Sequence, residues 1–209
     1  MATISKLISL IIFLQTVNFA ALNKCDTTIG YRSTIITCIE SNCPKDSLIT
    51  QYRNNKLERC HIYYSCKDSG MFLYFSPEGD TLTKSFFKSG KTVGLLQEWY
   101  NNKKIKRKCN YNSSGEKHGL CETWFENGNR KDSVVYNNGK IVEGRYYFRN
   151  GKLRYTAKLK NGDIVKAVYF SPDGEKTGEI INGNGTVLIY DVDGLSPSEF
   201  KCKDGKWVD

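Results

Sequence analysis

The chain has 209 residues and a formal net charge of +9 at neutral pH, with 39% hydrophobic, 25% charged and 12% aromatic residues. These proportions exclude a disordered tail and indicate a folded soluble protein. Tyr and Phe are abundant, at thirteen and ten, whereas Pro and Met number only four and two, which favours strands over helices.

The chain begins with a pattern typical of an export signal. In MATISKLISLIIFLQTVNFA, Lys6 precedes a short apolar run, and small Ala20 and Ala21 follow it. We therefore predict a secretory signal peptide over residues 1–20 and a secreted or periplasmic, cell-envelope location. An uncleaved membrane anchor is the alternative, but the run is short for a bilayer span. Because no second apolar segment follows, we expect no transmembrane segment in the mature chain.

All eight cysteines lie beyond this leader, at positions 25, 38, 43, 60, 66, 109, 121 and 202. An even number in an exported chain favours disulfides. The spacings fit no standard zinc pattern and His61 and His118 are the only histidines, so we predict no metal site and no cofactor. Residues 21–48 are expected to form a cysteine-rich N-terminal cap over the open edge of the domain that follows.

An aromatic pair recurs along the rest of the chain at steps of 25, 25, 23 and 22 residues. The pairs are Tyr74-Phe75, Trp99-Tyr100, Trp124-Phe125, Tyr147-Phe148 and Tyr169-Phe170. Each is followed by a polar turn such as ENGN or SPDGE, a second strand and a further turn. Asn-Gly and Asp-Gly between alternating strands are strong hairpin signals, because tight turns require positive φ.

A unit of this size supplies two short strands and cannot bury its aromatic face alone, whereas stacked copies can. We therefore predict an all-β fold over residues 49–209: an elongated single-layer antiparallel sheet of about seven stacked β-hairpin repeats. Several units close on Gly94, Gly119 or Gly144, which we expect to permit a tight approach between units.

The units resemble the MORN repeat, in the variant form of the bacterial YwqK-like "antitoxin" family. The matching segments are EWYNNKKI at 98–105, TWFENGNR at 123–130, YYFRNGKL at 146–153, GEKHG at 115–119 and GKIVEG at 139–144. The resemblance covers about residues 49–195, and the cysteines and the SPEG and SPDG turns depart from it. It implies a stacked-hairpin sheet, and it points to a toxin or a membrane lipid as partner.

Cys109 and Cys121 fall on the last strand of one unit and the first strand of the next, with a Gly-containing turn between them. That arrangement suits neighbouring antiparallel strands, so we predict a Cys109–Cys121 disulfide. The five N-terminal cysteines are expected to form two bridges among themselves, leaving one to pair with Cys202 or remain free.

No convergent catalytic set is recognisable, so we predict that the protein is not an enzyme. His118 near Cys121 could in principle activate a thiolate, but a bridged cysteine is the simpler interpretation. Glu98, Glu122 and Glu126 stand at different offsets from the aromatic pairs, and we interpret them as solvated strand positions.

Two groups of residues are candidates for binding. The basic run NNKKIKRKC contains Lys103, Lys104, Lys106, Arg107 and Lys108 and suits an anionic lipid or glycan, although strand alternation would split it between faces. The second group is aromatic and consists of Trp99, Tyr100, Trp124, Phe125, Tyr147 and Phe148. A single-layer sheet cannot bury both faces, so we expect one aromatic row to be partly exposed and available for docking.

The leading hypothesis is a secreted or cell-envelope repeat scaffold that binds a partner protein, for example on a host surface, without catalysis. The alternatives are a toxin-neutralising antitoxin or immunity protein and a binder of an anionic membrane surface. We do not expect nucleic acid as a partner, because an exported protein rarely meets it.

Overall fold

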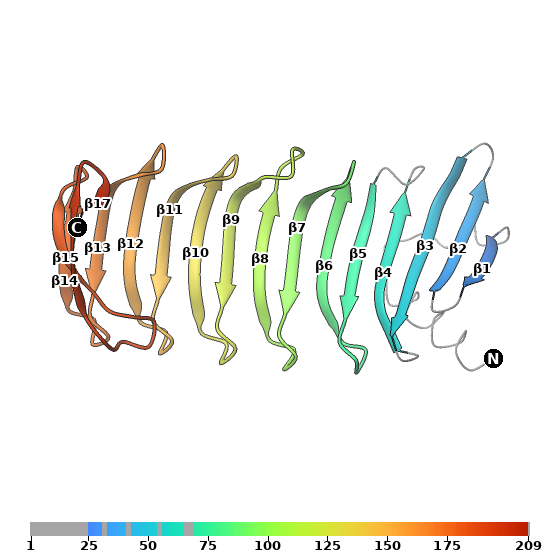
Figure 1. Ribbon diagram of the computed structural model, residues 1–209, viewed down its shortest axis with the longest axis horizontal. Coiled ribbons are helices and arrows are strands. Elements are labelled where there is room, and N and C mark those ends of the chain that lie inside the picture. Colours follow the sequence, from blue (N-terminus) through green and yellow to red (C-terminus); the bar gives the residue numbers. More distant parts are fainter. Residues whose placement is uncertain (1–24, 31–32, 41–42, 54–55, 65–68, 209) are drawn as a thin grey trace.

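The computed structural model describes the backbone of residues 25–30, 33–40, 43–53, 56–64 and 69–208, and the side chains of residues 69–208. Across these ranges the chain forms one sheet of seventeen strands and no helix (Figure 1). Every strand pairs antiparallel with the next strand in the chain. The predicted all-β fold, an elongated single-layer sheet of stacked hairpins, is confirmed.

In chain order the strands are β1 (Cys25–Gly30), β2 (Ser33–Glu40), β3 (Cys43–Arg53), β4 (Lys56–Tyr64), β5 (Ser69–Phe75), β6 (Thr81–Lys88), β7 (Lys91–Trp99), β8 (Ile105–Tyr111), β9 (Lys117–Trp124), β10 (Arg130–Asn137), β11 (Lys140–Tyr147), β12 (Leu153–Lys160), β13 (Asp163–Phe170), β14 (Lys176–Ile181), β15 (Gly185–Ile189), β16 (Ser198–Lys203) and β17 (Lys206–Val208). The predicted signal peptide lies outside the described residues. The predicted cap over 21–48 falls on β1, β2 and part of β3, and its role as a cover stays a prediction.

The two long edges of the sheet use different turns. At one edge, here called the long-turn edge, five-residue turns begin at Ser76, Tyr100, Phe125, Phe148, Ser171 and Asp191. In each, the first residue's amide donates to the carbonyl of the fifth, and its carbonyl accepts from the amide of the fourth. The other edge carries a five-residue turn at 112–116 and two-residue turns, such as Asn138-Gly139, with positive φ at both residues.

These turns correct the predicted alignment of the repeats. Tyr100, Phe125 and Phe148 open their turns, whereas Ser76 and Ser171 open theirs one residue after an aromatic pair. Trp99, Trp124 and Tyr147 are therefore equivalent to Phe75 and Phe170, and not to Tyr74 and Tyr169 as the aromatic spacing suggested. The sequence pattern slips by one residue in the two units with SPEG and SPDG turns.

The slip has a hydrogen-bonding cause. Where Ser76 opens the turn, its Oγ accepts from the amides of Glu78 and Asp80, at 3.2 and 3.3 Å. Where an aromatic residue opens the turn, an Asn at the third position takes over this role: Asn127 Oδ1 accepts from the Asn129 amide at 3.0 Å. All three described turns that open on an aromatic residue have such an Asn at the third position: Asn102, Asn127 and Asn150.

One face of the sheet carries the core and is called the core face. Cross-strand pairing aligns a row of small or medium-sized residues, all of them buried: Cys109, Cys121, Val134, Gly144, Ala157, Ala167 and Ile180. Longer side chains of the same face fold over this row; a Cβ built at Gly144 would lie 2.7 Å from the Tyr146 ring. A single layer therefore makes its core within one face.

The closing glycines serve different purposes from the one predicted. Gly94 and Gly119 have φ values of 67° and 78° and open space around a built Cβ, so the backbone conformation, and not a close approach, requires Gly there. At Gly144 the close neighbour is Tyr146 of the same strand, and not the next unit.

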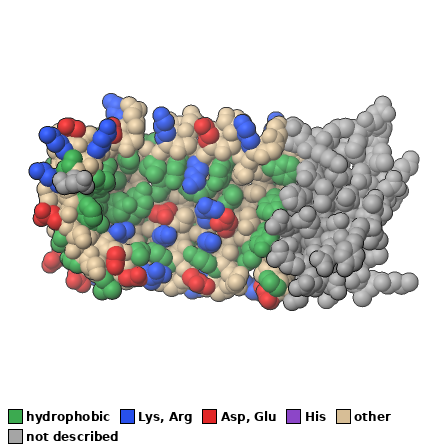
Figure 2. All heavy atoms as spheres, in the orientation of Figure 1, with side chains coloured by type: hydrophobic (Ala, Val, Ile, Leu, Met, Phe, Trp, Pro, Cys, Tyr) green, Lys and Arg blue, Asp and Glu red, His purple; other side chains and the backbone are tan. Residues whose placement is uncertain are grey.

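The C-terminal end of the sheet curls over its own core face. Val187 of β15 and Cys202 of β16 join Ala157, Ala167 and Ile180 in one buried cluster. The turn after β16 is tied back to β13, because the Ile164 amide donates to the Gly205 carbonyl at 3.0 Å. Figure 1 shows these last strands lying against β13 and β14 at one end of the array, and Figure 2 shows apolar side chains gathered over this end and along one half of the face.

Lys103→Gly is expected to stabilise the protein. Lys103 stands at the fourth position of its turn with φ 66°, where the other five-residue turns of the described residues have Gly. A left-handed conformation costs an ordinary residue about 1–2 kcal/mol. Gly avoids this cost but loses more conformational entropy on folding, which offsets about 0.5–1 kcal/mol of the gain. We expect a net gain of about 0.5–1 kcal/mol in chemical denaturation. Gly128→Ala, the converse change in the next hairpin, should destabilise; equal effects of the two would contradict the assignment.

Candidate binding trough

Two shallow hollows meet on the core face beside the long-turn edge, where they share Tyr100 and Glu126. We call them together the trough. Its walls are Tyr74, Leu82, Thr83, Glu98, Trp99, Tyr100, Asn101, Lys106, Phe125, Glu126, Lys131, Asp132, Tyr146, Tyr147, Arg149, Arg154 and Val192. These residues come from strands β5 to β8 and β10 to β12, from the long turns after β7, β9 and β11, and from the segment after β15, so the trough crosses several repeats.

A continuous column of directly paired residues runs along the trough and contributes Tyr74, Thr83, Glu98, Asp132 and Tyr146 to its walls. It runs through Tyr74, Thr83, Glu98, Arg107, Thr123, Asp132, Tyr146, Tyr155 and Tyr169. Within it Arg107 pairs with Glu98, and Thr123 Oγ1 donates to Asp132 Oδ2 at 2.6 Å. The last three rings stack, with centroids 4.2 and 5.0 Å apart. The middle of the face is therefore polar and one end aromatic.

Cations lie over the aromatic rings of the trough. Lys106 Nζ is 5.7 Å from the centre of the Tyr100 ring, and the Arg149 guanidinium is 4.9 Å from that of Phe125. The Arg154 guanidinium lies 5.6 Å from the Tyr155 ring. Each contact contributes about 0.5–1 kcal/mol at an exposed site. The stacked cations keep their charge at the surface of the trough while their stems cover apolar rings.

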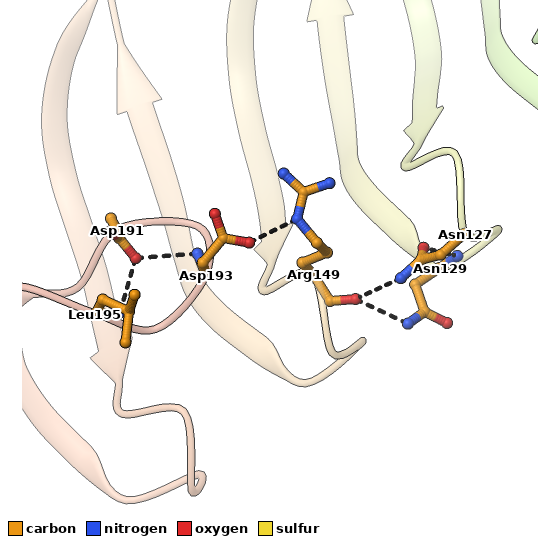
Figure 3. Close-up of polar contacts among 6 residues, drawn as sticks. All are labelled: Asn127, Asn129, Arg149, Asp191, Asp193 and Leu195. Carbon is orange, nitrogen blue, oxygen red and sulfur yellow. Dashed lines mark hydrogen bonds and ion pairs between the residues drawn. The ribbon is translucent and has the colours of Figure 1, made fainter.

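Side chains of one turn hold the next turn in place (Figure 3). Asn127 and Asn129 both donate from Nδ2 to the Arg149 carbonyl, at 3.0 and 2.9 Å. The Arg149 side chain in turn donates from Nε to Asp193 Oδ1 at 2.6 Å. Asp191 Oδ1 fixes that last turn by accepting from the amides of Asp193 and Leu195. Arg149 is thus anchored at both its backbone and its guanidinium.

The predicted aromatic residues divide into two groups. Trp99, Trp124 and Tyr147 are half-buried, whereas Phe125 and Phe148 are 5% and 1% exposed. Tyr100 is half-buried and its hydroxyl donates to the Trp124 carbonyl at 2.7 Å. The trough gathers Trp99, Tyr100, Phe125 and Tyr147, while Trp124 and Phe148 lie outside its walls.

The predicted basic run is divided by the hairpin. Lys103 and Lys104 stand in the turn, where Lys103 pairs with Asp80 at 2.9 Å and Lys104 Nζ donates to the Asn127 carbonyl at 2.6 Å. The remaining three alternate along β8: Lys106 and Lys108 are exposed, and Arg107 is half-buried in the paired column. The five cations do not form one patch.

Sequence reasoning missed Arg149 and Arg154 and misjudged two carboxylates. Glu98 and Glu122 were interpreted as solvated, but they pair with Arg107 and with Arg130, at 3.0 Å for the latter, and their side chains are 19% and 20% exposed. The signal was available, because Glu98 and Arg107 stand at similar distances on either side of the turn and must face each other across the hairpin.

The reactive groups of the described residues are occupied in structural contacts. Cys109 and Cys121 form the predicted disulfide, and Cys202 is a buried free thiol whose pKa is raised by burial. His118 is exposed on β9, and its Nδ1 lies 3.2 Å from Oδ1 of Asn138 in the neighbouring turn. In the same residues, no cluster of His, Cys, Asp or Glu could hold a metal ion, and no helix is long and apolar enough to cross a membrane.

The stacked tyrosines should make stability fall in alkaline solution. Burial first, and a neighbouring ionisable group second, raise the pKa of Tyr155 and Tyr169 from 10.0 to about 12. Unfolded tyrosines lose protons from pH 10 upward and the folded ones keep them, so this stability is complete below pH 10 and is lost as pH rises to about 12.

The measurement is the Tm across this pH range. The double variant Tyr155→Phe, Tyr169→Phe should flatten the fall, whereas Tyr147→Phe should keep it. An unchanged pH profile in the double variant would contradict the attribution.

Comparison with known proteins assigns no family to this chain. No protein-family model and no curated protein matches the chain, so the resemblance to MORN and YwqK-like repeats stays a prediction. Among solved structures, the chain is similar to TarM and to a point mutant of S. aureus TarM in complex with fondaparinux, alpha-GlcNAc-glycerol and UDP. Each match has 13% identity and a TM-score of 0.31, and covers 62% of this chain and 23% of the TarM chain. The chain thus spans less than a quarter of the length of these proteins.

Proposed function

We propose that this protein is an exported repeat scaffold that binds a partner protein through the trough and catalyses no reaction. The composition of the trough walls carries the proposal, because they combine Trp99, four tyrosines, Arg149 and Arg154. Trp, Tyr and Arg are the side chains most enriched among residues that dominate protein–protein binding energy. A shallow, elongated surface of this kind suits a protein segment better than an enclosed small-molecule site.

Contacts within the scaffold hold two arginines in and beside the trough. Arg149 is held by Asn127, Asn129 and Asp193, and Arg107 by Glu98. Side chains that are already ordered lose little conformational entropy on binding, so more of the contact energy appears as affinity. The polar middle and the aromatic end of the column would set the register of the partner.

Site-specific photo-crosslinking tests the proposal. A photoreactive phenylalanine analogue is placed at Glu126 or Lys131, which are exposed in the trough, and as matched controls at Leu120 or Val142, which are 45% and 41% exposed outside it. In the cells that produce or meet the mature protein, adducts with one partner should form from the trough positions alone. Adducts formed equally from Leu120 and Val142 would contradict the proposed surface.

Charge reversal then separates the partner classes. Arg149→Glu should weaken binding to the crosslinked partner by at least about tenfold, the effect of losing a dominant interface residue. If that partner is encoded beside this protein and is toxic alone, the scaffold is an antitoxin or immunity protein. Binding to anionic vesicles that salt abolishes, with no protein adduct, would instead identify a membrane-surface binder that uses exposed Lys106 and Lys108.

A further inference from the structure

The sequence contains six Asn-Gly pairs, and one of them differs from the rest in its hydrogen bonds and packing. They begin at Asn127, Asn138, Asn150, Asn161, Asn182 and Asn184. We propose that Asn161 is a site of spontaneous deamidation in the folded protein and that the other five pairs are protected. The proposal is independent of the proposed function.

The chemistry of this modification needs only water. The backbone nitrogen of the following Gly attacks Cγ of the Asn side chain, a C–N bond forms, and the side-chain nitrogen leaves as ammonia with the amide proton of Gly. Water then opens the cyclic imide at one of its two carbonyl carbons, which leaves Asp or isoaspartate. Gly favours the reaction because it has no side chain to obstruct the attack and lets the backbone rotate.

In four pairs the attacking nitrogen is occupied by a hydrogen bond. Within the five-residue turns, the Gly128 amide donates to the Phe125 carbonyl at 2.9 Å and the Gly151 amide donates to the Phe148 carbonyl at 2.9 Å. At the other edge, neighbouring hairpins supply the acceptor. The Gly139 amide donates to the Lys117 carbonyl at 2.9 Å, and the Gly183 amide donates to the Val165 carbonyl at 3.1 Å. Each bond must break before the nitrogen can attack.

The fifth protected pair is held through its side chain. Asn184 donates from Nδ2 to the Asn182 carbonyl at 2.9 Å and accepts from the Asp204 amide at 3.2 Å. The following Gly185 is packed against β14, since a Cβ built on it would lie 2.2 Å from the Glu179 carbonyl oxygen. This backbone cannot rotate into the cyclic imide without moving its neighbour.

Asn161-Gly162 lacks every one of these restraints. Both residues are exposed, nothing lies within 4 Å of a Cβ built at Gly162, and, among the residues that the structure describes, neither the Asn161 side chain nor the Gly162 amide makes a hydrogen bond. The amides of Gly139 and Gly183 each donate to a neighbouring hairpin, whereas the Gly162 amide does not. No hydrogen bond or packed neighbour therefore keeps the Gly162 backbone nitrogen from reaching Cγ of Asn161.

Deamidation here would alter the contact between β13 and the C-terminal strands. Isoaspartate inserts an extra carbon into the backbone of a two-residue turn, and either product adds a negative charge close to Asp163. Ile164, two residues after the turn, donates to the Gly205 carbonyl that anchors the curled end. Slow loss of the turn geometry should therefore loosen this anchor.

Peptide mapping by mass spectrometry tests the proposal. The folded mature protein is aged in mildly alkaline buffer, and the deamidated fraction of each Asn-Gly peptide is followed beside a denatured sample. In the folded protein the Asn161 peptide should react at close to its denatured rate, and the other five about two- to tenfold more slowly, the range that breaking one net hydrogen bond implies.

Two variants complete the experiment. Asn161→Gln should abolish most deamidation of the folded protein, because a Gln side chain cyclises far more slowly, while Asn138→Gln should leave the total unchanged. An intact Asn161, or a folded-state rate at Asn138 or Asn150 equal to that at Asn161, would overturn the proposal.

Discussion

Replacing Cys109 and Cys121 together by Ala should lower the free energy of unfolding of the central hairpins by about 3 kcal/mol, the loop-closure contribution of a bridge of this length. The two cysteines are directly paired on β8 and β9, are 12 residues apart in sequence, and are 0% and 4% exposed. Because repeat arrays are stabilised unit by unit, the loss should be concentrated in β8 and β9. Amide hydrogen exchange measured strand by strand reports this local stability.

Two comparisons isolate the crosslink from the loss of packing. Val134→Ala shortens a side chain of the same buried row and keeps the bridge; it should cost about 2 kcal/mol in lost apolar burial. Proteolysis within 110–120 should leave wild-type fragments joined until they are reduced, whereas fragments of the double variant separate at once. Equal exchange rates of β8 and β9 in wild type and double variant would show that the bridge does not stabilise the array.

Phe148→Ala should destabilise the region around β11 and β12 by about 3–5 kcal/mol, the usual cost of emptying a buried Phe site. Phe148 is 1% exposed and opens the turn between these strands, where its amide and carbonyl make both closing hydrogen bonds. The substitution removes the ring without changing those bonds, so the loss reflects packing alone. The same turn presents Arg149, and we therefore expect partner binding to weaken as well.

Chemical denaturation and the crosslinking yield at Glu126 measure the two effects. Phe200→Ala is the matched control, because Phe200 is 43% exposed and its loss should cost well under half as much. A similar loss of stability from both substitutions would mean that the long-turn edge does not carry the packing assigned to it.

The sheet itself was predictable because its signals are local. Asn138-Gly139 between two alternating segments indicates a hairpin without reference to the rest of the chain, and the Cys109–Cys121 pairing followed from the hairpin geometry. What local spacing could not supply was the exact alignment of units, because Ser76 and Ser171 move the turn by one residue while the aromatic pair keeps nearly the same period.

The trough was only partly predictable for a different reason. Trp99 and Tyr100 were found because they belong to the repeat, but Arg149 acquires its orientation from Asp193, 44 residues later. That contact exists because the C-terminal strands curl over the core face. The repeat pattern of the sequence does not predict this curl. Arg154, bonded to the Tyr190 carbonyl at 2.8 Å, depends on the same curl.

The strictly sequential pairing of the strands has a mechanical consequence. Before β13 each strand pairs only with its predecessor and its successor, so a force that pulls the two ends apart would open this part of the array one hairpin at a time. Each unit of about 24 residues would release roughly 80 Å of extended chain in a separate step. The Cys109–Cys121 bridge would shorten one of these steps, so the force–extension record of a single molecule would mark where along the array the crosslink lies.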